Sequence, residues 1–105
     1  MSRPYYASEI LETLHVGDQE QEVVAVVEAF HNPDKERVHV RLDVFLREVN
    51  QRGPDRELRP EWLPRPQEAD EGVSADDATS LARDLFHRWV GKVREALRVR
   101  REGEI

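Results

Sequence analysis

The sequence predicts an α+β domain, in which an antiparallel β-hairpin or three-stranded meander carries a long C-terminal helix on one face. Two observations predict this class. Within residues 37–48, apolar side chains occupy every second position from Val38 to Leu46, as in a strand with one buried face. Residues 74–100 repeat apolar side chains at the spacing of an α-helix. With 105 residues, the chain has the usual length of one domain, which we expect to span 1–105.

Two apolar segments, residues 22–31 and 37–48, are the expected strands of the hairpin. The first segment is rich in valine, whose branched side chain favours strands. Between the segments, Asn32 and Pro33 suit the first two positions of a type I turn. The hairpin is therefore predicted both by its strands and by its turn.

The loop length of the hairpin decides which side chains face the core. A four-residue loop, 32–35, pairs His31 with Glu36 and sets Glu28 opposite His39 on the outer face. A five-residue loop would turn Glu28 toward the core, and burying an unpaired carboxylate costs several kcal/mol. We therefore expect the four-residue loop. It leaves four large apolar side chains on the outer face of the sheet: Val24, Val26, Phe30 and Phe45.

The helix is expected over Ser74–Arg100. Ser74 suits the N-cap, and Asp76 and Asp77 place negative charge in the first turn, where the helix dipole favours it. The predicted core stripe consists of Ala78, Ala82, Leu85, Trp89, Val93 and Ala96. The helix would be about 39 Å long and the strand over 37–48 about 40 Å. These matched lengths predict a helix lying along the alanine-lined face of the hairpin.

The N-terminal segment, residues 7–16, fits two structures. Ile10, Leu14 and Val16 alternate as in an edge strand, although Glu12 interrupts the pattern. Tyr6, Ile10 and Leu14 also share one face of a helix. The sequence slightly favours the strand and leaves both open.

Residues Asn50–Val73 hold four of the six prolines and show no apolar periodicity. We expect a long proline-rich loop here, and loops of this length in compact domains tend to be functional or disordered.

The composition excludes several classes of protein. The chain has no cysteine, so it has no disulfide, no cysteine-ligated metal and no cysteine nucleophile. No apolar run reaches the roughly 18 residues that a membrane span needs. The 22 acidic and 16 basic residues give a net charge of -6. We expect an acidic cytoplasmic protein that needs no membrane and no cofactor.

Signals for catalysis and for metal binding are weak. The Glu28–His39 pair expected on the outer face has the chemistry of a general acid–base pair, but such a pair on an open sheet is usually an ordinary cross-strand contact. The four histidines are far apart in sequence and form no metal-binding motif. We assign no catalytic and no metal-binding residue. A small enzyme or ligand binder, with a pocket between sheet, helix and loop, stays open as the second alternative.

One flank of the helix is basic. Five side chains lie within about 60° of one another on the helical wheel: Arg83, His87, Arg94, Arg98 and Arg101. Arginine binds phosphate or carboxylate groups through paired hydrogen bonds, so a nucleic-acid-binding protein is the first alternative function. Residues 1–80 carry 9 basic and 18 acidic side chains, whereas residues 81–105 carry 7 and 4. This asymmetry favours docking of the helix on its own acidic body.

The preferred function is that of a non-catalytic interaction module that forms a homodimer or binds another protein. The four apolar residues of the outer face need a cover on so small a domain. That cover is either the proline-rich loop, through Trp62 and Leu63, or a second subunit. Gly91, in the middle of the helix and away from the core stripe, would allow a second backbone to approach closely. The expected interaction surface is therefore the outer sheet face or edge, with Trp62 and Gly91.

Overall fold

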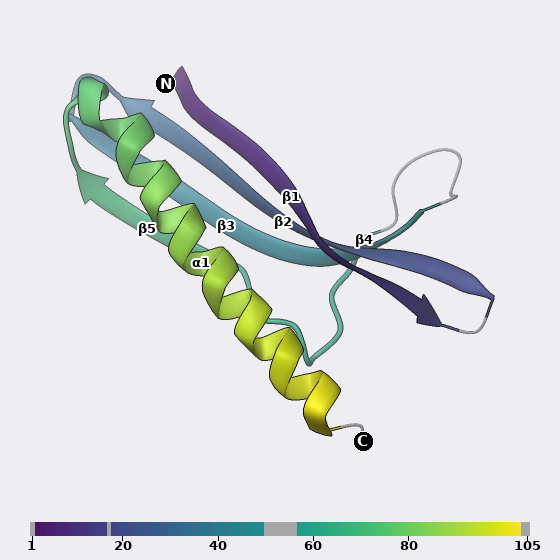
Figure 1. Ribbon diagram of the computed structural model, residues 1–105. Helices are drawn as coiled ribbons and strands as arrows, with labels where there is room; N and C mark the ends of the chain where they lie inside the picture. The colour runs from purple at the N-terminus through teal and green to yellow at the C-terminus, as the bar shows by residue number, and fades with distance from the viewer. Residues whose placement is uncertain (1, 17, 50–56, 104–105) are drawn as a thin grey trace.

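The computed structural model describes residues 2–16, 18–49 and 57–103 of the chain. Its elements are β1 (Ser2–Val16), β2 (Gln19–Asn32), β3 (Arg37–Glu48), β4 (Glu57–Leu58), β5 (Gln67–Gly72) and α1 (Ala75–Gly103). The strands form one antiparallel sheet in the order β1-β2-β3, and β3 is flanked on its other side by β5 along its first half and by β4 at its end. The single long helix α1 lies across one face of this sheet, as Figure 1 shows. The predicted α+β class is therefore confirmed.

The N-terminal segment is a strand, which resolves the alternative that the sequence left open. β1 pairs with β2 from end to end, and its register shifts between Ile10 and Glu12. This β-bulge leaves Leu11 as an extra residue, so the face on which alternate side chains lie changes there. Leu11 and Leu14 then both pack against the core. The bulge is the reason that the alternation of the sequence fails at Glu12.

The hairpin of β2 and β3 has the predicted faces but not the predicted register. Asn32 pairs with Arg37 and His31 with Val38, so the four-residue loop is residues 33–36 rather than 32–35. The Asn32 side chain accepts a hydrogen bond from the backbone N–H of Asp34, at 3.1 Å, and stays at the end of the strand. Glu36 closes the loop with a φ of 47°, in the left-handed region.

The pairing of Glu28 with His39 is consequently wrong. Glu28 lies opposite Arg41, and His39 lies opposite Phe30. Each strand enters the loop one residue away from the expected position, so the two changes together preserve the faces. The helix-facing side of the hairpin is mostly aliphatic, with the polar residues Gln21 and His31 buried near its two ends. Its buried apolar members are Val23, Ala25, Val27, Ala29, Val38, Val40, Leu42, Val44 and Leu46.

Helix α1 begins one residue after Ser74, whose carbonyl accepts the hydrogen bond from the N–H of Ala78 at 3.1 Å. The buried face is rotated slightly from the predicted stripe. Phe86 and Val90 are buried, whereas Leu85 is only half-buried at the flank. Phe86 belongs to the same core cluster as the buried residues of β2 and β3. The full buried set is Ala78, Ala82, Phe86, Trp89, Val90, Val93 and Leu97.

The segment expected as a proline-rich loop contains two short strands and a core anchor. Its first part, residues 50–56, lies outside the described residues. β5 pairs with the first half of β3, although Ala69 is its only apolar side chain. Leu63, between β4 and β5, is buried in the main core, with Trp62 packed beside it. Backbone pairing with β3, rather than apolar alternation, explains why this sequence forms a strand.

Candidate interaction surface

The outer face of the sheet is the face that α1 does not cover (Figure 1). Its side chains form rows that run across β1, β2 and β3, because residues paired in an antiparallel sheet lie on the same face. One row consists of Ile10, Val24 and Phe45. The next two rows are Ser8, Val26 and Asp43, and then Tyr6, Glu28 and Arg41. An apolar row is thus followed by rows that become increasingly polar.

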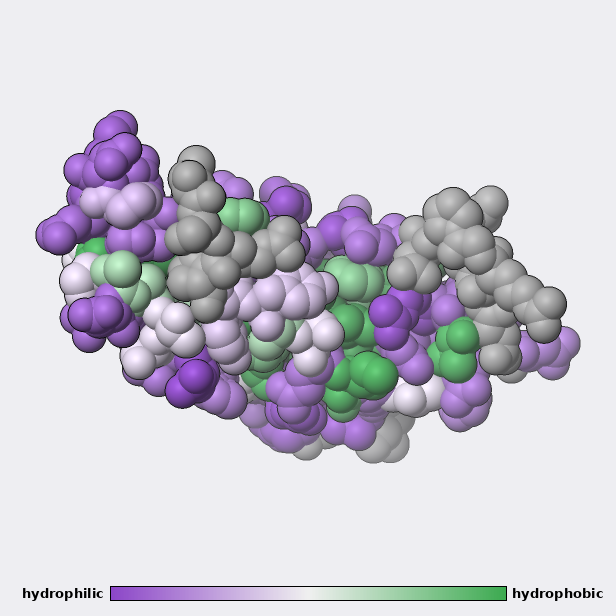
Figure 2. Space-filling model, turned by 90° about the horizontal axis from the view of Figure 1, so that it is seen from above, coloured by the Kyte–Doolittle hydropathy of each residue, from purple (hydrophilic) through white to green (hydrophobic). Residues whose placement is uncertain are grey.

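The centre of this outer face is buried, whereas its β1 side is exposed. Val24 and Phe45 are only 3% and 7% exposed. Tyr6 and Ile10, which end their rows on β1, are both 53% exposed. In the view of Figure 2, hydrophobic residues gather in a patch in the right half of the molecule, with hydrophilic surface around it.

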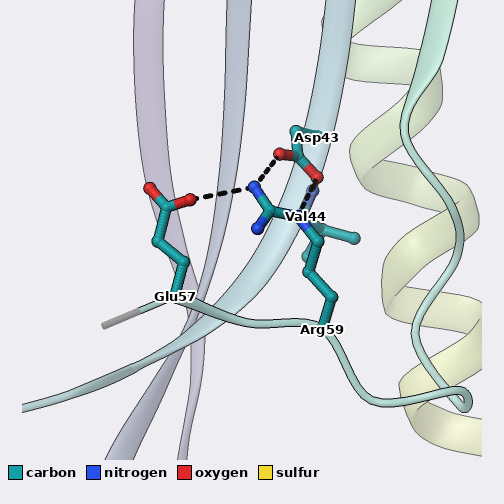
Figure 3. Close-up of polar contacts among 4 residues, drawn as sticks. All are labelled: Asp43, Val44, Glu57 and Arg59. Atoms are coloured by element: carbon teal, nitrogen blue, oxygen red, sulfur yellow. Dashed lines mark hydrogen bonds and ion pairs between the residues drawn. The ribbon is translucent and has the colours of Figure 1, made fainter. Parts of the chain in front are cut away.

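Arg59, which follows β4, covers the Phe45 ring. Its guanidinium carbon lies 5.5 Å from the ring centroid, within the range of a cation–π contact. The same guanidinium donates hydrogen bonds to the carboxylate of Asp43, at 2.5 and 3.3 Å, and to Glu57 at 2.9 Å (Figure 3). The backbone N–H of Val44 donates a further bond to Asp43, at 2.8 Å. The buried Asp43 carboxylate is thereby held by both backbone and side chain.

These hydrogen bonds fix the charge of the contact. The bond to Asp43, with a further contribution from Glu57, raises the pKa of the Arg59 guanidinium above its already high ordinary value. Arg59 therefore stays cationic at neutral pH. The surrounding hollow has a volume of about 190 Å³, below the range of about 300–1,000 Å³ that is typical of small-molecule pockets. Its lining favours a closed polar contact over a ligand site.

The predicted surface residues are only partly brought together. Val24, Val26, Phe30 and Phe45 do share the outer face. Trp62 lies on the opposite side of the sheet, beside the core, and Arg100 stacks over its ring at 4.0 Å. Trp62 and Leu63 are therefore not the cover of the outer face, because Leu63 is drawn into the helix-side core. Sequence reasoning missed Arg59, whose partner Asp43 stands in another strand, and no local pattern connects the two.

Gly91 is also away from the outer face. It lines a groove of about 540 Å³ between α1 and β1, together with Leu11, Glu12 and Leu97. A Cβ atom added at Gly91 would meet no heavy atom within 4 Å. The flank of the helix that carries Gly91 is thus open, and it lies on the β1 side of the molecule.

The basic flank of the helix contacts acidic groups of the same chain. Arg94 forms an ion pair with Glu9 at 3.0 Å and donates a hydrogen bond to the Leu11 carbonyl at 3.5 Å. Arg101 lies 3.4 Å from Glu12. These contacts support docking of the basic helix on the acidic sheet, and they occupy groups that a nucleic acid would need.

The other members of the basic flank make different contacts. Arg98 pairs with Glu95 on the helix itself, and this bond lowers the pKa of the Glu95 carboxyl. Arg83 stacks over the ring of Tyr5, at 5.8 Å from its centroid. The His87 side chain is exposed. Three of the five side chains nevertheless line the same groove as Gly91: Arg94, Arg98 and Arg101.

His39 forms an ordinary surface contact. His39 lies 3.5 Å from Glu68 of β5, with both side chains exposed to solvent. Across the described residues, no group of three histidine or acidic side chains is placed to hold a metal ion. Among the same residues, no helix combines the length and the apolar character needed to cross a bilayer.

Searches against models of protein families, curated protein sequences and solved structures find no match to this chain. The function is therefore argued from the geometry above.

Proposed function

We propose that this protein is a non-catalytic interaction module that self-associates through the free edge of β1 and the adjoining outer face of the sheet. The observation that carries the proposal is the end position of β1. It is 15 residues long, and no second strand pairs with its other edge among the residues that the structure describes. The unpaired N–H and C=O groups of an edge strand offer hydrogen bonds to a further strand.

The side chains beside this edge support the same function. Ile10 and Tyr6 are among the most exposed large apolar side chains of the described chain, and they stand on one face of β1, separated by Ser8. Ile10 also ends the apolar row that continues through Val24 to Phe45. A strand added to β1 would extend this row and cover both exposed side chains. A second copy is the favoured partner because twofold homodimers are the commonest soluble assembly.

The opposite edge of the sheet does not offer the same opportunity. It consists of the short strands β4 and β5, and β5 is acidic, with Glu68, Asp70 and Glu71 along it. Short, charged strands are a common means of preventing edge-to-edge pairing. The proposal therefore concerns the β1 edge alone. The cytoplasmic location expected from the cysteine-free, acidic composition is part of the same proposal.

Sedimentation velocity over a range of concentrations tests this function. We expect the wild-type chain, of 12.3 kDa, to sediment as a dimer at tens of micromolar and to dissociate on dilution. Ile10→Glu should shift the chain to monomer without unfolding it, because the introduced charge lies on the exposed side of an edge strand.

Val99→Glu is the matched control. Val99 is 55% exposed, almost the same as Ile10, but it stands on α1 and lies on the opposite side of the helix from Arg94 and Arg101, which face β1. This variant should remain dimeric. A wild-type chain that sediments only as a 12.3 kDa species at tens of micromolar would overturn the proposal, and so would equal weakening by both variants.

A further inference from the structure

We propose that two copies of the chain pair their β1 strands antiparallel, about a twofold axis that passes through Ser8. This inference rests on the proposed function and adds the register of the contact. The register shifts of β1 lie between Ser2 and Tyr5 and between Ile10 and Glu12. The stretch Tyr5–Ile10 between them is regular, so it is the part of the edge that can accept a continuous ladder.

The geometry of an antiparallel ladder restricts the axis to a few positions. Residues that face each other in such a ladder direct their N–H and C=O groups in the same sense. A twofold axis between two identical strands therefore passes through a residue and not between two residues. An axis through Tyr5 or Ile10 would carry every pair except the central one past a register shift. This leaves the axes through Tyr6, Ala7, Ser8 and Glu9 to compare.

Charge and exposure distinguish these registers. An axis through Glu9 would place two Glu9 carboxylates directly opposite each other, which destabilises a strand pair. An axis through Ala7 or Tyr6 would pair Ile10 with Pro4 or Ser2, past the register shift that ends the regular stretch, and would not place Tyr6 opposite Ile10. An axis through Ser8 instead pairs Tyr6 of each copy with Ile10 of the other. Both exposed apolar side chains are then covered, and the contact is made twice.

The helix-facing side of the ladder is compatible with the same register. Glu9 would lie opposite Ala7 of the second copy, while its carboxylate keeps the ion pair with Arg94 at 3.0 Å. No new unpaired charge is buried. A twofold axis perpendicular to the sheet leaves both helices on one face, and the open flank at Gly91 lies on the β1 side of each helix. The dimer would thus be a continuous sheet with two helices across one face.

A cysteine scan under mild oxidation tests the axis, and the chain has no native cysteine to interfere. In Ser8→Cys, the two thiols would stand on directly opposed residues, whose Cα atoms are about 4.5–5.5 Å apart, within the range of a disulfide. We expect this variant to form a covalent dimer in high yield with oxidised glutathione. Thr13→Cys is the control, since Thr13 is exposed on the same face of β1. In the proposed dimer, residue 13 of one copy would lie about 34 Å from residue 13 of the other, at about 3.4 Å per residue, so this variant should not crosslink.

A charge-pair rescue gives an independent readout of the same register. Tyr6→Lys and Ile10→Glu should each weaken the dimer at least tenfold in sedimentation. The double variant should recover most of that loss, because the introduced lysine of each copy faces the introduced glutamate of the other.

The possible outcomes separate the two proposals. A dimer that persists in sedimentation without a Ser8→Cys crosslink, or that crosslinks equally through Thr13→Cys, would overturn the register and keep self-association. A chain that is monomeric at every concentration, with neither crosslink, would overturn both.

Discussion

The two edges of this sheet differ in the length of their strands and in the exposure of their apolar side chains. The β1 edge is one strand of 15 residues, with Tyr6 and Ile10 exposed along it. The other edge is divided between β4, of two residues, and β5, of six. That second edge is fixed from both faces, by Leu63 in the core and by Arg59 on the outer face. The edge of β3 is thus paired by short strands of the same chain, and we propose that the long β1 edge, which no further described strand pairs, receives a partner.

On its helix-facing side, the β1 edge is supported by two ion pairs with α1. Arg94 and Arg101 of α1 reach Glu9 and Glu12 on the helix-facing side of β1. These exposed ion pairs orient the strand and contribute little to stability, since such pairs are typically worth about 0–1 kcal/mol. They leave the backbone groups of the edge available. The closed edge should therefore respond to mutation through stability, and the open edge through association.

The largest expected effect is at the core anchor of the closed edge. Leu63→Ala should lower the free energy of unfolding by about 2–5 kcal/mol, because it removes a buried leucine and leaves a cavity under the segment between β4 and β5. Urea denaturation measures this loss. Leu58→Ala, on the same edge but largely exposed, should cost less than about 1 kcal/mol. Equal losses at both leucines would mean that Leu63 does not anchor this edge.

The polar anchor on the outer face should give a smaller effect. Asp43→Ala removes the buried acceptor of Arg59 and of the Val44 N–H, and we expect a loss of about 1–3 kcal/mol. The value stays below that of a fully buried ion pair because Arg59 is partly exposed and can return to water. Asp70→Ala, which removes an exposed partner of Arg37, should change stability by no more than about 0.5 kcal/mol. Similar losses in the two variants would contradict the role of Arg59 in closing the outer face.

The smallest predicted effect is a gain of stability on the open side. Gly91→Ala should raise the free energy of unfolding by about 0.5–1 kcal/mol, because alanine loses less backbone entropy in a helix and the added methyl group meets no atom. Thermal unfolding of the dilute, monomeric chain measures it. A loss of stability in that state would mean that the groove between α1 and β1 is closed in solution, and it would weaken the contrast between the two edges.

The sequence predicts the parts of this fold that depend on side-chain alternation. The position of Glu28 correctly predicts which faces of β2 and β3 are buried. Burying an unpaired carboxylate is costly for either position of the loop, so this prediction does not depend on the register. The register depends instead on the Asn32 side chain and the left-handed Glu36, and neither affects the apolar pattern. The apolar spacing of α1 predicts its extent within a few residues, but it misplaces Leu85, because the spacing alone does not distinguish the centre of the buried face from its flank.

The parts that the sequence does not predict depend on distant partners. β5 has no strand pattern of its own and forms because β3 offers a free edge. Arg59, which follows β4, reaches Asp43 in β3. The sequence of neither segment alone therefore predicts this contact on the outer face. The bulge at Leu11 is an exception. Once this segment is taken as a strand, the positions of Ile10, Leu11 and Leu14 indicate that the apolar side chains change face at Leu11. The exposed Tyr6 and Ile10 edge becomes evident only when the order of the strands is known.

Amide hydrogen exchange, measured as a function of protein concentration, tests most directly that the open edge receives the partner. With mass-spectrometric readout of peptides above and below the concentration of dimer formation, we predict that exchange slows in Tyr5–Ile10 as the concentration rises. The Gln67–Gly72 strand on the closed edge should exchange at the same rate throughout. Slowing in Gln67–Gly72, or slowing that is absent from Tyr5–Ile10 while the chain dimerises, would contradict the account.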